Sequence, residues 1–266
     1  MRQRLVVGNW KMHTTLSEAL ILATSLRNSV SEVGGVKVVL CPPFPWIVPV
    51  AEILTHRPSH LKLGAQDAYY KEEGAVTGAV SAAMLRGIVD YVIVGHSERR
   101  RIFKESSTLV NEKVHAVIKQ GMTVILAVGE LTRVHHQEKR HHGRPTRTEA
   151  RSDITTQLEE GLAGISKSEV GQIVVVYEPI WAISGGGDWN AADGAYANHV
   201  AGIIREWLEQ RFGRRYAQEI LVLYGGSVNP TNVEEFSSQP EIDGVLSGAA
   251  SLKAKEFTAI CQAFAR

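Results

Sequence analysis

Residues 92–98 read VIVGHSE, and this stretch holds the local pattern that decides the fold. An apolar run at residues 92–94 stops at Gly95, and His96 follows at once. A short run that is apolar on both faces is typical of a strand in a parallel sheet covered by helices. The stretch therefore predicts a buried strand that passes directly into a helix, with a histidine at the junction.

The position of His96 favours a neutral imidazole. The first turn of a helix lies at the positive end of the helix dipole, which disfavours a second positive charge on the ring. A lone histidine is equally compatible with a structural role, so the rest of the chain has to distinguish the two interpretations.

The same alternation recurs along the chain. Short runs rich in valine and isoleucine predict strands at residues 5–7, 36–40, 61–64, 91–94, 123–128, 173–177, 220–224 and 244–246. Between them, helices are predicted at residues 16–28, 46–54, 82–86, 107–119, 148–162, 194–211, 230–237 and 253–264. Asn229 and Pro230 predict an N-cap followed by proline at the first helical position.

These strand–helix units predict an α/β fold closed into a (β/α)8 barrel. The 266 residues contain no linker and no break in composition, so we expect a single domain over residues 1–266. A doubly wound open sheet with additional strands is the alternative, because short apolar runs are easily misassigned.

Composition and charge exclude several classes of protein. The net charge of +1, with 44% hydrophobic residues, gives no global field for nucleic acid or an acidic membrane surface. No apolar run is long enough to span a membrane, and MRQRLVVGNW lacks a signal-peptide core. Cys41 and Cys261 lie far apart and match no metal or redox spacing, which fits reduced thiols. We expect a cytoplasmic protein with no nucleic-acid or membrane partner.

Residues 135–147, HHQEKRHHGRPTR, depart from the alternation. The four histidines invite a metal site, but no carboxylate or cysteine set completes one. A solvated helix and loop is the favoured interpretation, and no metal is expected. The chain also lacks a phosphate-binding nucleotide loop and a dinucleotide fingerprint, so no cofactor is expected.

Polar groups follow several of the predicted strands, where the functional residues of parallel barrels lie. Asn9 and Lys11 follow the first strand, His96 the fourth and Glu178 the sixth. After the seventh and eighth strands, YGGSV (224–228) and SGA (247–249) offer backbone N–H groups to a phosphate. These groups have complementary chemistry: a cation, an amide donor, an imidazole and a carboxylate.

Five segments carry a family resemblance. GNWKM (8–12), VGHSERR (94–100), YEPIWAI (177–183), YGGSV (224–228) and SGAASLK (247–253) have the order, spacing and strand-end positions of triosephosphate isomerases. The chain therefore resembles that family from Val7 to about Lys253. The resemblance implies a cofactor-free glycolytic and gluconeogenic isomerase that interconverts D-glyceraldehyde 3-phosphate and dihydroxyacetone phosphate.

The resemblance also implies a role for each matching residue. Glu178 is the base that removes a proton beside the carbonyl, and neutral His96 polarises that carbonyl and shuttles protons. Lys11 supplies positive charge, Asn9 a hydrogen bond, and Glu98 a carboxylate near the lysine. The phosphate would be held by backbone N–H groups near four residues: Ser184, Ser227, Gly248 and Ala249.

Two departures from the family pattern affect loops. Residues 179–189 correspond to a lid whose tip reads SGGG at 184–187 instead of a sequence close to GTGK, and glycines raise the entropy of an open loop. The third loop matches at residues 74–78, GAVTG, but Ala79 replaces a usual glutamate. That loop normally reaches into a partner subunit, so the resemblance implies a homodimer.

Three other activities stay open on the residues alone. The altered lid tip is compatible with a longer ketose phosphate, such as a tetrulose phosphate. Lys11 is compatible with a Schiff-base aldolase, since barrels support both chemistries. A relative that only binds sugar phosphates is the third, although the joint presence of Asn9, Lys11, His96 and Glu178 argues against it.

Overall fold

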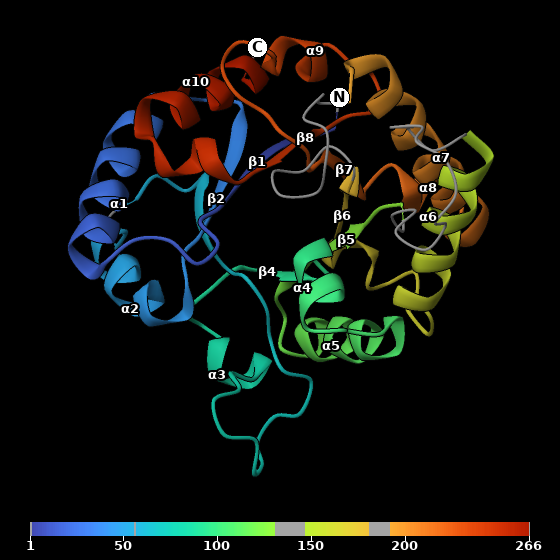
Figure 1. The fold of residues 1–266 in the computed structure, drawn as a ribbon, viewed down its shortest axis with the longest axis horizontal. Helices are drawn as coiled ribbons and strands as arrows, with labels where there is room; N and C mark the ends of the chain where they lie inside the picture. The colour runs from blue at the N-terminus through green and yellow to red at the C-terminus, as the bar shows by residue number, and fades with distance from the viewer. Residues whose placement is uncertain (1, 56, 131–146, 181–191, 266) are drawn as a thin grey trace, which may run out of the picture.

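The computed structural model describes residues 2–55, 57–130, 147–180 and 192–265 (Figure 1). Its strands form one closed parallel barrel, in which each strand pairs with the next and β1 pairs with β8. The open doubly wound sheet is therefore wrong, and the predicted barrel is confirmed. The strands are β1 (Arg4–Asn9), β2 (Val36–Cys41), β3 (Leu61–Ala65), β4 (Tyr91–Val94), β5 (Thr123–Val128), β6 (Ile173–Tyr177), β7 (Leu221–Tyr224) and β8 (Gly244–Ser247).

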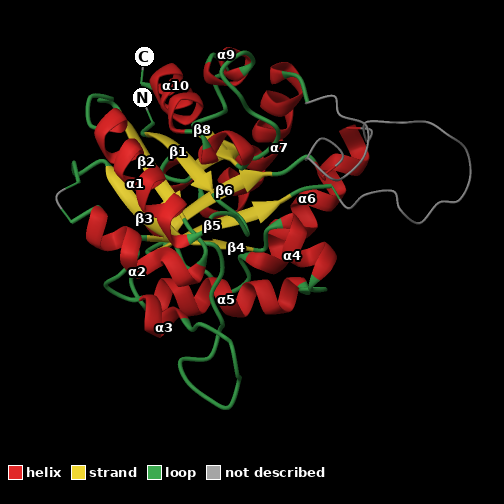
Figure 2. Ribbon diagram, turned by 60° about the vertical axis from the view of Figure 1, so that its left-hand side comes forward, coloured by secondary structure: helices red, strands yellow, loops and turns green. Residues whose placement is uncertain are grey.

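Helices surround the barrel, as Figure 2 shows. They are α1 (Leu16–Val30), α2 (Phe44–Ile53), α3 (Ala82–Leu85), α4 (Ser97–Ile102), α5 (Ser107–Lys119), α6 (Arg147–Gly161), α7 (Gly194–Phe212), α8 (Arg214–Ala217), α9 (Val233–Ser237) and α10 (Ala254–Phe264). None of the described helices is long and apolar enough to cross a bilayer.

One helical prediction needs correction, and one short helix was not predicted. The helix predicted at residues 194–211 is confirmed as α7, and the segment after it forms a separate short helix, α8, because Gly213 interrupts the chain with a φ of +90°. The helix expected to begin at Pro230 begins at Val233, and Asn232 is its N-cap. Asn229 instead organises a turn before the helix, since its Oδ1 accepts hydrogen bonds from the backbone N–H groups of Thr231 and Asn232.

The alternation of side chains along each strand produces two hydrophobic clusters. Leu5, Val7 and Ile93 belong to a cluster with residues of the other strands that fills the barrel interior. Val6 and Val92 face outward and join the larger cluster between the barrel and the helices. Both faces of the strands are buried, which explains why the strands appear in the sequence as continuous apolar runs.

The segment between β3 and α3 extends away from the barrel (Figures 1 and 2). Its base is closed by backbone hydrogen bonds between Tyr69 and Val80, with an N···O distance of 2.7 Å, and between Ala82 and Tyr69. The protruding loop therefore has a fixed base.

Candidate active site

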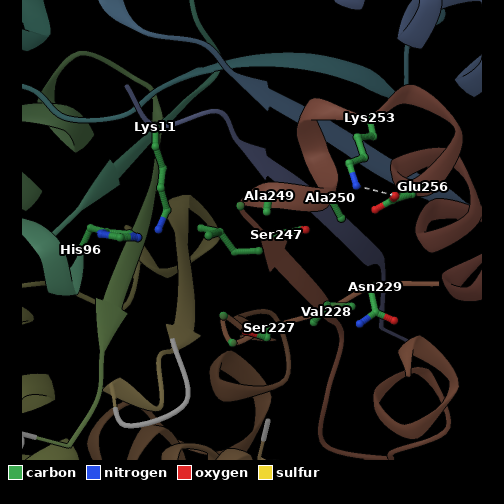
Figure 3. Close-up of a pocket in the computed structure, with 14 residues that line it drawn as sticks. Lys11, His96, Ser227, Val228, Asn229, Ser247, Ala249, Ala250, Lys253 and Glu256 are labelled. Carbon is green, nitrogen blue, oxygen red and sulfur yellow. Dashed lines mark hydrogen bonds and ion pairs between the residues drawn. The ribbon is translucent and has the colours of Figure 1, made fainter. Parts of the chain in front are cut away.

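A cavity of about 200 Å³ opens where the loops that follow β1, β4, β7 and β8 converge (Figure 3). Lys11 and His96 reach into one end of it, and the chain from Gly225 to Asn229 lies opposite the turn from Gly248 to Ala250. Lys253 and Glu256, joined by an ion pair of 2.9 Å, line its far end. The volume suits a small metabolite better than a nucleotide.

His96 lies at the junction between β4 and α4, as the opening stretch predicts. It is the N-cap of α4, and its Nδ1 accepts a hydrogen bond of 3.2 Å from the Glu98 backbone N–H. An acceptor Nδ1 leaves the ring proton of a neutral imidazole on Nε2. Gly95 permits the sharp turn because its φ is +73°, and an added Cβ would lie 2.9 Å from the Arg100 guanidinium.

Glu178 follows β6 and lies beside this histidine. Its Oε1 is 3.0 Å from His96 Nε2, and its Oε2 accepts a 2.8 Å hydrogen bond from the Ser97 backbone N–H. The side chain is 1% exposed and is not part of the cavity wall. An added Cβ at Gly225 would lie 3.0 Å from the Glu178 Cγ, so this glycine leaves the space that the carboxylate arm occupies.

Lys11 adopts a left-handed backbone conformation, with a φ of +52°. Its backbone N–H donates to Asn9 Oδ1 at 3.0 Å, and its carbonyl accepts from Gln66 Nε2 at 2.9 Å. Such a conformation is strained for a non-glycine residue and persists only where the surroundings fix it. Asn9 and Gln66 therefore fix the direction in which the lysine side chain leaves the backbone.

The Lys11 ammonium forms a 2.7 Å ion pair with Glu98 Oε1. Burial alone would raise the pKa of Glu98, but the hydrogen bond and the charge of Lys11 outweigh this effect and hold the pKa below its usual range. The two side chains are thus paired as ammonium and carboxylate at the edge of the cavity.

The opposite wall of the cavity is built from close backbone approaches. At Gly226 an added Cβ would lie 2.1 Å from the Tyr224 hydroxyl oxygen, so no larger residue fits. Gly248 faces the Lys11 Cε, and Ala249 begins the short 3-10 helix η3 (Ala249–Leu252). The φ of Ala249 is not positive, so alanine is accommodated there without strain.

The structure brings most of the predicted site residues together. His96, Glu178, Lys11, Asn9 and Glu98 are joined by the contacts above. Ser227, Gly248 and Ala249 line the cavity across from Lys11, as Figure 3 shows for the labelled residues. Ser184, residues 181–189 of the predicted lid and residues 135–146 lie outside the described residues.

The match to known proteins covers almost the whole chain. The family model described as triosephosphate isomerase matches residues 4–264. This chain belongs to the triosephosphate isomerase family. Triosephosphate isomerase of Dehalococcoides mccartyi (strain CBDB1) is 43% identical over 262 residues, which cover 98% of this chain and 96% of the relative. The triosephosphate isomerase of Carboxydothermus hydrogenoformans is 42% identical over 261 residues, which cover 98% of both chains. That of Dictyoglomus thermophilum is 39% identical over 258 residues, which cover 97% of this chain and 98% of the relative.

Sequence reasoning missed two residues that shape this triosephosphate isomerase site. Gln66 holds the Lys11 carbonyl and also donates to the Cys41 carbonyl at 2.9 Å. Gln66 directly follows β3, at the carboxyl end of the strand, and this position could have indicated it from the sequence. Ser97 contributes only its backbone N–H to Glu178, so no side-chain pattern indicates it.

Within the described parts of the chain, no group of three or more His, Cys, Asp or Glu residues is placed to hold a metal ion. The cavity wall offers the Lys11 ammonium, the His96 imidazole and backbone N–H groups, and the Glu178 carboxylate lies directly behind His96. Such a set can accept a carbon-bound proton and stabilise an oxyanion.

Proposed function

We propose that this chain interconverts D-glyceraldehyde 3-phosphate and dihydroxyacetone phosphate by proton transfer through an enediolate. Its family and the names of its relatives support an isomerase of this class. The observation that carries the proposal is the pair formed by His96 Nε2 and Glu178 Oε1, 3.0 Å apart, with His96 Nδ1 occupied as an acceptor. A carboxylate base and a neutral hydrogen-bond donor are thereby presented side by side.

In the proposed reaction, Glu178 removes a proton from the carbon next to the carbonyl. The carboxylate must first leave the Ser97 N–H, because it does not reach the cavity in the conformation described. His96 Nε2–H donates to the carbonyl oxygen and then exchanges protons between the two enediolate oxygens. Lys11 supplies positive charge to the developing oxyanion. Asn9 fixes the backbone of Lys11 by accepting a hydrogen bond from its N–H.

The phosphate of the substrate is proposed to bind between Ser227 on one side of the cavity and the turn at Gly248 and Ala249 on the other, together with Ser184. Glycine at 226 and 248 lets backbone N–H groups approach an anion closely. Binding energy gained at the phosphate, away from the reacting carbons, can then orient the triose. We propose that residues 179–189 act as the lid that excludes water.

The competing chemistries receive no support from this geometry. A Schiff-base aldolase needs a neutral lysine amine, whereas the Lys11 Nζ is held in an ion pair with Glu98 at 2.7 Å. The family assignment and the names of the relatives favour the triose over a longer ketose phosphate.

We also propose that the chain is a single domain that forms a homodimer in the cytoplasm. The closed barrel uses strands from Arg4 to Ser247, which supports one domain. Cys41 and Cys261 are free and buried, which agrees with a reducing compartment.

A recess beside the protruding loop supports the dimer. It measures about 360 Å³ and is lined by Phe44, Gly78, Ala79 and Phe103 among others. Phe103, on the wall of the recess, is 64% exposed although its side chain is large and apolar. A loop and a recess on the same face are complementary in a two-fold dimer, because each copy offers both.

A side-by-side assay tests the proposed reaction. The purified protein is given D-glyceraldehyde 3-phosphate or a tetrulose phosphate, without added metal, and product is followed with a coupling dehydrogenase. We expect a kcat/KM for the triose well above that for the tetrulose. Faster turnover of the tetrulose, or trapping of substrate on Lys11 by borohydride, would contradict the proposal.

A further inference from the structure

A buried carboxylate outside the cavity accepts hydrogen bonds from two phenol hydroxyls. Glu130, just beyond β5, accepts a hydrogen bond of 2.7 Å from Tyr177 and one of 3.0 Å from Tyr196. Both bonds end on the same oxygen, Oε1, and Glu130 is only 2% exposed. Hydrogen bonds to a buried carboxylate are stronger than those between neutral groups.

The two phenols come from opposite ends of the β6–α7 connection. Tyr177 is the last residue of β6 and directly precedes Glu178. Tyr196 lies in the first turn of α7, where its backbone N–H donates to the N-cap Asp193 at 2.7 Å. One carboxylate oxygen therefore ties the end of β6 to the start of α7.

The backbone around Glu178 leaves little room for movement. The Glu178 N–H donates to the Val128 carbonyl at 2.8 Å, and the Tyr177 carbonyl accepts from the Gly225 N–H at 2.7 Å. An added Cβ at Gly129 would lie 2.0 Å from the Glu178 carbonyl oxygen. The backbone at Tyr177 and Glu178 is therefore held on both sides, and the contact of the Tyr177 hydroxyl with Glu130 adds a further constraint directly before Glu178.

Loss of one phenol hydroxyl changes the set of hydrogen bonds that Glu130 accepts. Without the Tyr196 hydroxyl, the buried Glu130 carboxylate would lose one of the hydrogen bonds that hold it in place. Because Tyr177 donates to the same oxygen, a shift of the carboxylate would carry the Tyr177 ring with it.

We propose that Tyr196 is a positioning residue for the isomerase reaction: its hydroxyl fixes Glu130, which fixes Tyr177 and thereby the Glu178 carboxylate beside His96. The inference rests on the proposed function, since it assigns Glu178 the role of base. It places a residue of α7, remote from the cavity wall, in control of the proton-transfer step.

Tyr196→Phe removes a single oxygen atom and tests the proposal. We expect kcat for D-glyceraldehyde 3-phosphate to fall about tenfold. KM should stay within about twofold of the wild-type value, because the residues proposed to bind the phosphate are unchanged. The isotope effect on kcat with substrate deuterated at the reacting carbon should rise, since proton transfer becomes slower relative to the other steps. A purely structural role would leave the isotope effect unchanged.

Tyr216→Phe is the matched control. Tyr216 lies in α8, directly before β7 and therefore at the amino end of the barrel, and its variant should keep the wild-type kcat. An unchanged kcat in Tyr196→Phe, or a loss that appears only in KM, would overturn the inference.

A double-mutant cycle with Glu130→Ala, which removes the acceptor of both phenol hydroxyls, tests the route. If Tyr196 acts through Glu130, its loss in the Glu130→Ala background should cost clearly less than in the wild type. Fully additive losses would overturn the inference. Wild-type protein that fails to turn over triose phosphates overturns the proposed function as well, whereas active wild type with an equally active Tyr196→Phe overturns only the positioning role.

Discussion

The proposed base, Glu178, and the proposed electrophile, His96, are held by consecutive backbone N–H groups. Ser97 N–H binds the Glu178 carboxylate and Glu98 N–H binds His96 Nδ1, so the first turn of α4 orders both side chains. Backbone donors of this kind are fixed by the fold and need no side-chain ordering of their own. His96 is thereby fixed as a donor through Nε2 before any substrate arrives.

Glu178→Asp retains the carboxylate but shortens the side chain by one carbon–carbon bond, about 1.5 Å. We expect kcat to fall about 100-fold, because misplacement of a reacting group by this distance has such a cost. KM and the melting temperature should change little. Steady-state kinetics with both triose phosphates measure the effect, and an unchanged kcat would remove Glu178 from the mechanism.

Glu98→Gln should reveal a pH-dependent contribution to stability. Because the folded-state pKa of Glu98 is lowered, its ionised form stabilises the protein fully above the ordinary value of 4.5, and this contribution is lost as the pH falls through the folded-state pKa. We expect the melting temperature of the wild type to exceed that of the variant by a constant amount near neutral pH. The difference should narrow as the pH falls below 4.5 and should vanish once Glu98 is protonated in the folded state as well. A difference that grows in acid would contradict the assignment.

The connection from β4 to α4 determines the site more than any other element. Gly95 turns the chain with a φ of +73°, His96 caps the helix, and Ser97 and Glu98 supply the two N–H groups. The strand must end where it does for these donors to face Glu178 from β6.

Gly95→Ala should destabilise this connection. Its left-handed backbone is unfavourable for alanine, and the new Cβ would lie 2.9 Å from Arg100 and 3.1 Å from Val110. We expect a loss of about 1–3 kcal/mol in the free energy of unfolding, measured by denaturant titration.

Gly202→Ala is the control for that substitution. Gly202 lies inside α7, and an added Cβ meets nothing within 4 Å. The variant should be stabilised by about 0.5–1 kcal/mol, because alanine is the better helix former. Equal behaviour of the two variants would contradict the role given to the Gly95 turn.

At the scale of the molecule, the strand positions follow from the pattern, whereas closure of the barrel is shown only by the pairing of β1 with β8. Each strand is apolar on both faces, so residues such as 91–94 and 123–128 are recognisable without context. Helix starts are less predictable, since Asn229 resembles an N-cap but forms a turn. Contacts between distant residues are not readable from spacing: Gln66 to Lys11 and Tyr196 to Glu130 depend on how separate units pack.

The proposed homodimer makes a prediction at the same scale. Phe103→Glu places a charge beside the recess and should shift the protein towards monomers in sedimentation velocity. Ile21→Glu, which replaces another exposed apolar residue, on α1, is the matched control and should leave the sedimentation coefficient unchanged. Dissociation of both variants, or of neither, would contradict the proposed interface.

The central claim is that Glu178 moves a carbon-bound proton of a triose phosphate. The most direct measurement is proton nuclear magnetic resonance of dihydroxyacetone phosphate turnover in D2O, with a dehydrogenase removing the aldehyde product. The account predicts solvent deuterium at the carbon next to the carbonyl with the wild type, and loss of both turnover and deuterium incorporation in Glu178→Gln. Undiminished incorporation in Glu178→Gln would contradict it.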